Sequence, residues 1–187
     1  MIKLVDNDKL YELNLVDNDI LYLKYSGRAK AMYDAIPAQL NKNAMRYQVG
    51  KVIPDERAER IINVVKDMED SMTANVAFRS DDPNVGLALT KNLEYFKMYT
   101  SDTGLFVTLA FKDGDITENV IYEKLLNDKL SANLGYVYEN MIAQMLVSSG
   151  KDLFYHTIPY ADGKKYYETD FIITEKHKIS PIEVKSS

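Results

Sequence analysis

The sequence predicts an α+β fold in two parts. Residues 1–112 carry helical patterns followed by two β-prone runs, and residues 113–187 carry two helical patterns followed by three β-prone runs. We place the boundary at the polar turn that begins at Lys112. A chain of 187 residues is long enough for one medium domain or two small ones with real cores.

The first part opens with helical segments. Residues 28–36 fit one helix, and Pro37 is accepted in the first turn of a second helix that runs toward Leu40. We expect Pro54 to begin the clearest helix of this part, with two acidic residues directly after it, where the helix dipole favours them. Its apolar residues then recur at the spacing of one buried face: Ala58, Ile61, Ile62, Val65 and Met68.

Two β-prone runs end the first part. They cover residues 73–78 and 94–100, and a turn-rich segment at 81–86 separates them. Helices followed by such a hairpin have the outline of a winged-helix domain, an outline that many small α+β domains share. After the second run, we interpret Asp102 as a helix cap or Asx turn rather than as part of a catalytic loop.

The second part has the more regular pattern. A helix is predicted over 116–127 and a stronger one over 131–149, which Gly150 ends. The stronger helix carries a continuous apolar stripe: Leu134, Val137, Tyr138, Met141, Ile142, Met145 and Leu146. Three β-prone runs follow, over 153–158, 166–173 and 179–185, with turns at 162–163 and 175–178.

Candidate chemistry lies on the last two runs. Glu183 and Lys185 are two residues apart, so the period of a strand places them on one face, and the turn at 175–178 can bring Asp170 beside Glu183. Two neighbouring carboxylates with water suit Mg²⁺ or Mn²⁺. A lysine beside them can position an attacking water or stabilise charge on a phosphate. A Glu-x-Lys pair by itself is most often a solvated charge pair.

Glu139 adds a third carboxylate. On its helix it falls just beyond the edge of the apolar stripe, from where a side chain can reach a pocket between helix and sheet. Gly135, one turn earlier, allows a close approach of the sheet. The candidate catalytic residues are therefore Asp170, Glu183, Lys185 and Glu139, with Asp170 and Glu183 as metal ligands.

These residues lie in three segments, 135–139, 168–173 and 181–186, which closely resemble the C-terminal domain of unknown function attached to many prokaryotic AAA-type ATPases. Upstream segments also resemble that family, so that the resemblance covers about residues 22–187: they are 35–43, 96–99 and 102–105. The resemblance implies a winged-helix-like segment followed by a nuclease fold of the PD-(D/E)XK, restriction-endonuclease-like type, with its site at the four residues named above.

The ATPase module of that family is expected to lie outside this chain. No Gly-x-x-x-x-Gly-Lys-Ser/Thr sequence occurs here, so we expect no ATP site. The chain stops directly after the Glu-x-Lys run, where the nuclease fold normally continues with a helix and another strand. We therefore expect a truncated core with an uncovered sheet edge at 179–185, which invites self-association or pairing with a partner strand.

The composition limits which binding partners and which cellular compartment are expected for this chain. The net charge is -5, and a protein whose whole surface binds DNA usually has a basic excess, so DNA binding would need a local patch. The absence of cysteine excludes disulfides, thiolate zinc sites and cysteine nucleophiles. No apolar run is long enough to span a membrane, and no signal-peptide pattern begins the chain, so a cytoplasmic location is expected.

Two function classes follow from these observations. One is a metal-dependent DNA phosphodiesterase, or nuclease, module that works under an ATPase motor, with Mg²⁺ at Asp170 and Glu183, Lys185 activating water, and Glu139 as an additional ligand. By itself the truncated chain is then expected to be inactive. The other is a non-catalytic DNA- or protein-binding regulatory module, since the nuclease superfamily contains many inactive relatives.

Overall fold

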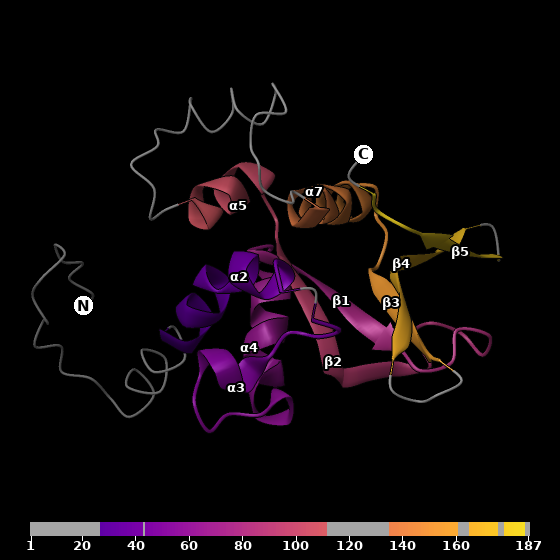
Figure 1. Cartoon of the computed structure of the whole chain (residues 1–187), viewed down its shortest axis with the longest axis horizontal. Coiled ribbons are helices and arrows are strands. Elements are labelled where there is room, and N and C mark those ends of the chain that lie inside the picture. The colour runs from indigo at the N-terminus through magenta and orange to yellow at the C-terminus, as the bar shows by residue number, and fades with distance from the viewer. Residues whose placement is uncertain (1–26, 43, 112–134, 161–164, 176–177, 186–187) are drawn as a thin grey trace, which may run out of the picture.

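The computed structural model describes residues 27–42, 44–111, 135–160, 165–175 and 178–185 (Figure 1). Five strands form one sheet in the spatial order β2-β1-β3-β4-β5. Their bounds are Ala74–Ser80 for β1, Lys91–Thr100 for β2, Phe154–Pro159 for β3, Tyr166–Glu175 for β4 and Lys178–Ile182 for β5. β3 runs parallel to β1, and the other neighbouring pairs are antiparallel.

Helices lie against the β1–β2 hairpin, which confirms the α+β class. Residues 27–34 are helical, and α2 (Ile36–Leu40), α3 (Val49–Val52) and α4 (Ala58–Asp70) follow. α2 and α4 contact β2, and α4 also contacts β1. α5 (Thr103–Ala110) and α7 (Gly135–Ser148) pack on each other and on β2. Figure 1 shows this pair side by side, away from α3 and α4.

Local signals in the sequence located the β1–β2 and β4–β5 hairpins. The predicted hairpin of the first part is the β1–β2 pair, and the predicted turn at 175–178 joins β4 to β5, with Glu175 opposite Lys178. The helix expected over 116–127 and the turn at 162–163 lie outside the described residues. In the described part, β2 and β5 are the two edges of the sheet. Self-association along the 179–185 run stays a prediction.

Strands from both sides of residue 112 share the sheet. β1 and β3 are direct neighbours, with Phe78 opposite Phe154. One continuous core also draws on both sides, for example with Phe96 of β2 and Phe171 of β4. The two predicted parts therefore pack on each other through one sheet and one core, and residue 112 itself lies outside the described residues.

The expected start of the longest helix of the first part at Pro54 was wrong. Asp55 has a left-handed backbone with a φ of 64°, which an α-helix does not accommodate, and Arg57 is extended. The helix, α4, therefore begins at Ala58, and the acidic residue of its first turn is Glu59. Part of the predicted core face is buried as expected: Ile61, Val65 and Met68.

The buried face of α7 differs from the predicted apolar stripe. Val137 is buried, and Ile142 and Leu146 are partly buried against the core, which confirms part of the stripe. However, Tyr138, Met141 and Met145 are exposed. Asn140, a polar residue outside the stripe, is instead fully buried, with 0% of its surface exposed. The helix turns this polar side chain inward because the end of β2 offers it hydrogen-bond partners.

The Asn140 side chain fastens α7 to the end of β2. Its Oδ1 accepts the Thr100 N–H at 2.8 Å, and its Nδ2 donates to Thr100 O at 3.3 Å and to Thr103 Oγ1 at 3.2 Å. One turn further along α7, Gln144 Oε1 accepts from the Thr103 N–H at 3.0 Å and from its hydroxyl at 2.7 Å. Asp102 accepts from two backbone N–H groups in the first turn of α5, which confirms the predicted helix cap.

Asn140→Ala is expected to lower the free energy of unfolding by about 2 kcal/mol, because it leaves the buried N–H of Thr100 without its acceptor. Urea denaturation followed by far-UV circular dichroism measures the loss. The matched control is Asn84→Ala, since Asn84 is exposed and its amide donates to Asp82 at the surface. We expect the control to change stability by less than about 0.5 kcal/mol, and equal losses in both variants would contradict the docking role.

Candidate functional site

The predicted site residues come from α7, β4 and the segment after β5. Glu139 lies on α7 and Asp170 lies within β4. The expectation of a strand through residue 185 was wrong, because β5 ends at Ile182. The N–H of Val184, which a longer ladder would pair with the β4 backbone, donates instead to Asp170 Oδ2 at 2.7 Å. Residues 183–185 therefore stay beside β4 without being part of the sheet.

The carboxyl group of Asp170 interacts with charged groups from each of these elements. Burial raises the pKa of Asp170 above its ordinary value, and the hydrogen bond from the Val184 N–H acts in the opposite direction. The carboxylates of Glu139 and Glu183 raise this pKa further. The structure thus brings three of the four predicted side chains into one electrostatic neighbourhood.

Lys185 lies at the solvent side of this group. Its Nζ is 3.1 Å from Glu183 Oε2, and its side chain is 80% exposed. Water screens an ion pair in this setting, so the pair contributes little to stability. Glu183 and Lys185 form a solvated pair next to Asp170 in this conformation.

The structure adds a lysine that sequence reasoning missed. The side chain of Lys97, on β2, is only 7% exposed, and its Nζ lies 3.2 Å from Glu139 Oε1 and 2.5 Å from Glu168 Oε1. Tyr99 lies two residues further along the same strand and donates its hydroxyl to Glu139 Oε1 at 2.6 Å. A lysine inside a run of apolar strand residues is the signal that could have found it.

One buried ammonium serves several carboxylates here. Burial by itself lowers the pKa of Lys97, but Glu139 and Glu168 outweigh that effect and hold the pKa above its ordinary value. The pKa of Glu168 is also raised, because burial outweighs the attraction of Lys97. Burial and the adjacent Glu139 carboxylate hold the pKa of Tyr99 well above its usual range, so its hydroxyl remains a donor.

Lys97 reaches Glu168 across two intervening strands. β1 and β3 separate β2 from β4, so the two strands lie about 14 Å apart at the usual strand spacing. Ala77, the partner of Lys97 on β1, is small enough to let the lysine stem pass. Tyr155 of β3 has its ring centre 5.6 Å from the Lys97 Nζ. Two long side chains, one from each strand, therefore close the distance.

The carboxylate cluster has some but not all of the properties of a Mg²⁺ site. Its oxygen donors are of the kind that Mg²⁺ prefers. However, among the residues that the structure describes, no three Asp, Glu, His or Cys side chains are arranged to hold a metal ion. Glu139 and Glu168 are bonded to the Lys97 ammonium instead. In this arrangement Glu139 and Glu168 do not fit a metal centre, because each is paired with Lys97.

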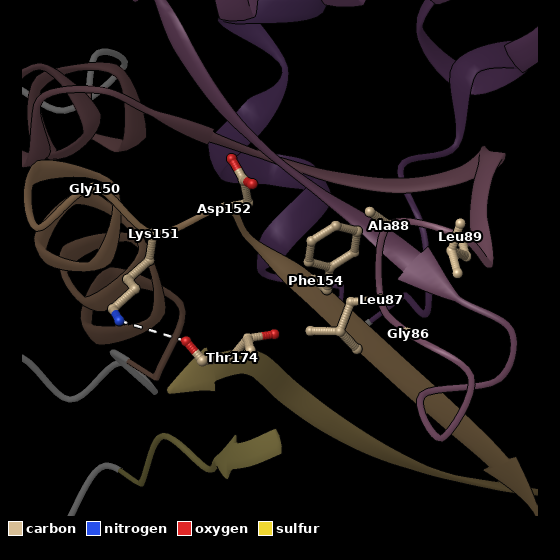
Figure 2. A pocket seen from close by; sticks show the side chains of 9 residues that line it. All are labelled: Gly86, Leu87, Ala88, Leu89, Gly150, Lys151, Asp152, Phe154 and Thr174. Atoms are coloured by element: carbon tan, nitrogen blue, oxygen red, sulfur yellow. Dashed lines mark hydrogen bonds between the residues drawn. The ribbon is translucent and has the colours of Figure 1, made fainter. Parts of the chain in front are cut away.

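A separate hollow of about 410 Å³ lies between the β1–β2 connection and the α7–β3 connection (Figure 2). It is lined by residues 86–89, residues 150–152, Phe154 and Thr174. Figure 2 shows the Lys151 side chain reaching toward β4, where its Nζ donates to Thr174 O at 3.5 Å. None of the four predicted site residues, all of which the structure describes, lines this hollow.

Comparison with known proteins bears on the second half of the chain. A family described as a domain of unknown function (DUF4143) matches residues 134–187, which is less than half of the chain. No curated protein and no solved structure matches the chain. The matched segment contains all four predicted site residues, whereas Lys97 and Tyr99 lie outside it. Similarity to a domain of unknown function is thus confirmed for residues 134–187, and the upstream resemblance stays a prediction.

Within the described part of the chain, no helix combines the length and apolar character needed to cross a membrane.

Tyr99→Phe is expected to lower the free energy of unfolding by about 2 kcal/mol, because it removes a hydrogen bond to a buried carboxylate. Tyr155→Phe is the matched control, since Tyr155 is equally buried but its hydroxyl has no hydrogen-bond partner among the described residues. We expect Tyr155→Phe to leave stability unchanged or to raise it slightly. Chemical denaturation of both variants measures the difference, and a larger loss in Tyr155→Phe would refute the assignment of Tyr99.

Proposed function

We propose that this chain is the C-terminal module of an AAA-type ATPase and belongs to the metal-dependent DNA phosphodiesterase class, with a winged-helix-like part before a PD-(D/E)XK nuclease-like core. The neighbourhood of Glu139, Asp170 and Glu183 supports this most directly. These carboxylates come from one helix, one strand and the segment after the next strand. Glu139 and Glu183 are close enough to Asp170 for their charges to raise its pKa. The family match over residues 134–187 covers all three residues.

The proposed roles follow the chemistry of each side chain. Asp170 and Glu183 are the candidate ligands of Mg²⁺ or Mn²⁺, and a bound ion of this kind stabilises negative charge on a phosphate. Lys185 is the candidate for orienting water, and Glu139 is an additional carboxylate beside Asp170. Glu183 and Lys185 lie beyond the last strand and are exposed to solvent, so both side chains are free to turn toward Asp170.

A second candidate is a non-catalytic DNA- or protein-binding regulatory module on the same fold. The observation that favours it is the Lys97 ammonium, which occupies the space between Glu139 and Glu168. A carboxylate that is already paired inside the protein is less available to a metal ion. The two candidates differ in one measurable property, which is the response of the folded chain to divalent cations.

On the nuclease proposal, Mn²⁺ or Mg²⁺ is expected to raise the melting temperature of the wild-type chain, because a ligand that binds only the folded state stabilises it. Glu183→Ala should abolish this rise, whereas Lys185→Ala should retain it. Differential scanning fluorimetry against cation concentration measures both. A wild-type chain that shows no cation response would favour the regulatory module.

Cleavage is then tested in the parent protein that contains the ATPase module. With Mn²⁺ and several forms of DNA, the wild-type parent is expected to cut, and its Glu183→Ala variant is expected to lose the activity. Lys185→Ala should lose cleavage while keeping the cation-dependent rise in melting temperature. Equal cleavage by wild type and Glu183→Ala would point to a contaminating nuclease and count against the proposed site.

A further inference from the structure

Lys97 stands out among the charged groups of the described chain. Its ammonium is buried and contacts carboxylates from two different elements, Glu139 on α7 and Glu168 on β4. In the other ion pairs of the described residues the basic side chain is more exposed, from 23% for Arg79 to 80% for Lys185. Burying a charge is costly unless partners compensate for it. The Lys97 ammonium is therefore stable only where Glu139 and Glu168 can pair with it.

The negative charge around Lys97 exceeds what one ammonium can balance. Glu139 and Glu168 contact Lys97, and the charge of Lys97 also acts on the Asp170 carboxylate, so one ammonium interacts with three carboxylates. Tyr99 assists by donating to Glu139, but a hydroxyl carries no charge. If Lys97 were removed, two partly buried carboxylates would lose their cation at the same time.

We propose that Lys97 is a positioning residue for the carboxylate site: its ammonium is the resident counter-ion that holds Glu139 and Glu168 at a fixed separation and excludes a divalent cation from the space between them. Because Glu139 belongs to the proposed site, this role rests on the proposed function. It also explains why the carboxylates do not surround a metal position in the described structure, since the lysine satisfies two of them.

The geometry makes this role specific to Lys97. β2 carries Lys97 on the same face as Tyr99, which already contacts Glu139, and from there the Lys97 side chain reaches both α7 and β4. Ala77 leaves room for the lysine stem to cross β1. If the Lys97 side chain is shortened or loses its charge, no other cation among the described residues pairs with Glu168.

Lys97→Met tests the role, because methionine keeps much of the stem and removes the charge. Without divalent cations, the variant is expected to melt about 10 °C below wild type, since it leaves two partly buried carboxylates without a cation. Mn²⁺ should recover at least about half of this loss by binding the freed carboxylates in the folded state, and it should act on wild type less. Lys30→Met is the matched control, because it removes a lysine from an exposed pair and should change neither property.

A double variant keeps the test decisive if Lys97→Met fails to fold. Lys97→Met/Glu168→Gln removes one stranded carboxylate, so it should melt above the single variant and respond less to Mn²⁺. Folding of the single variant only when Mn²⁺ is present would also support the counter-ion role. The role is overturned if Mn²⁺ affects Lys97→Met no more than wild type, or if the double variant is no more stable than the single one.

The outcome can be separated from that of the nuclease proposal. A wild-type parent that cleaves no DNA would remove the phosphodiesterase function, yet the comparison of Lys97→Met with its double variant would still report on the counter-ion. Conversely, metal-dependent cleavage by wild type together with a cation-insensitive Lys97→Met would keep the nuclease and reject the role of Lys97.

Discussion

The docking of α7 on the end of β2 is the constraint on which the carboxylate cluster depends. Asn140 has no exposed surface, so its amide must satisfy its hydrogen bonds inside the protein, and it does so with the backbone and side chains at Thr100 and Thr103. This requirement fixes the rotation of the helix about its axis. Glu139, the preceding residue, is thereby directed to Lys97 and Tyr99. A helix held by apolar contacts alone would tolerate more than one rotation.

The second layer of organisation is electrostatic. Lys97 joins β2 to α7 and to β4, so its ion pairs connect elements that the sheet does not hold together directly. Networks of buried charges are weak contributors to net stability, because desolvation offsets their attraction, but breaking one leaves an uncompensated charge. Their physical effect is therefore to penalise other arrangements. This cluster selects the one placement of α7 in which Glu139 and Glu168 share a cation.

The sequence was sufficient where the signal is local. Alternation and turn residues located the β1–β2 and β4–β5 hairpins, and the pairing of Glu175 with Lys178 followed from the predicted turn. The helix over α7 was also predicted, but its buried face was predicted only in part, because hydrophobic periodicity treats Tyr138 as core and Asn140 as surface. A polar side chain is buried at low cost only where it finds hydrogen-bond partners. The partners of Asn140 lie 37 and 40 residues earlier in the chain.

The candidate site was predictable to the same limited extent. Asp170 lies beside the segment that contains Glu183 because a short turn connects them, which spacing alone can indicate. The apolar run around Lys97 could have singled out the residue, but its contacts could not be predicted, since they span 42 and 71 residues of sequence and cross two strands of the sheet. No local pattern encodes a contact of that kind. It becomes visible only when the strand order is known.

The strand order also changes what counts as the functional unit. The segment that matches a family, residues 134–187, contains the carboxylates of Glu139, Glu168 and Asp170, but the cation and the hydroxyl that bind them come from β2. β2 is in turn held by β1, which pairs in parallel with β3. A unit cut at residue 134 would therefore keep the buried acidic groups and lose their charge partner. Since buried carboxylates without a cation are unfavourable, the cluster requires the hairpin from the first half of the chain, and the two halves function as one structural module.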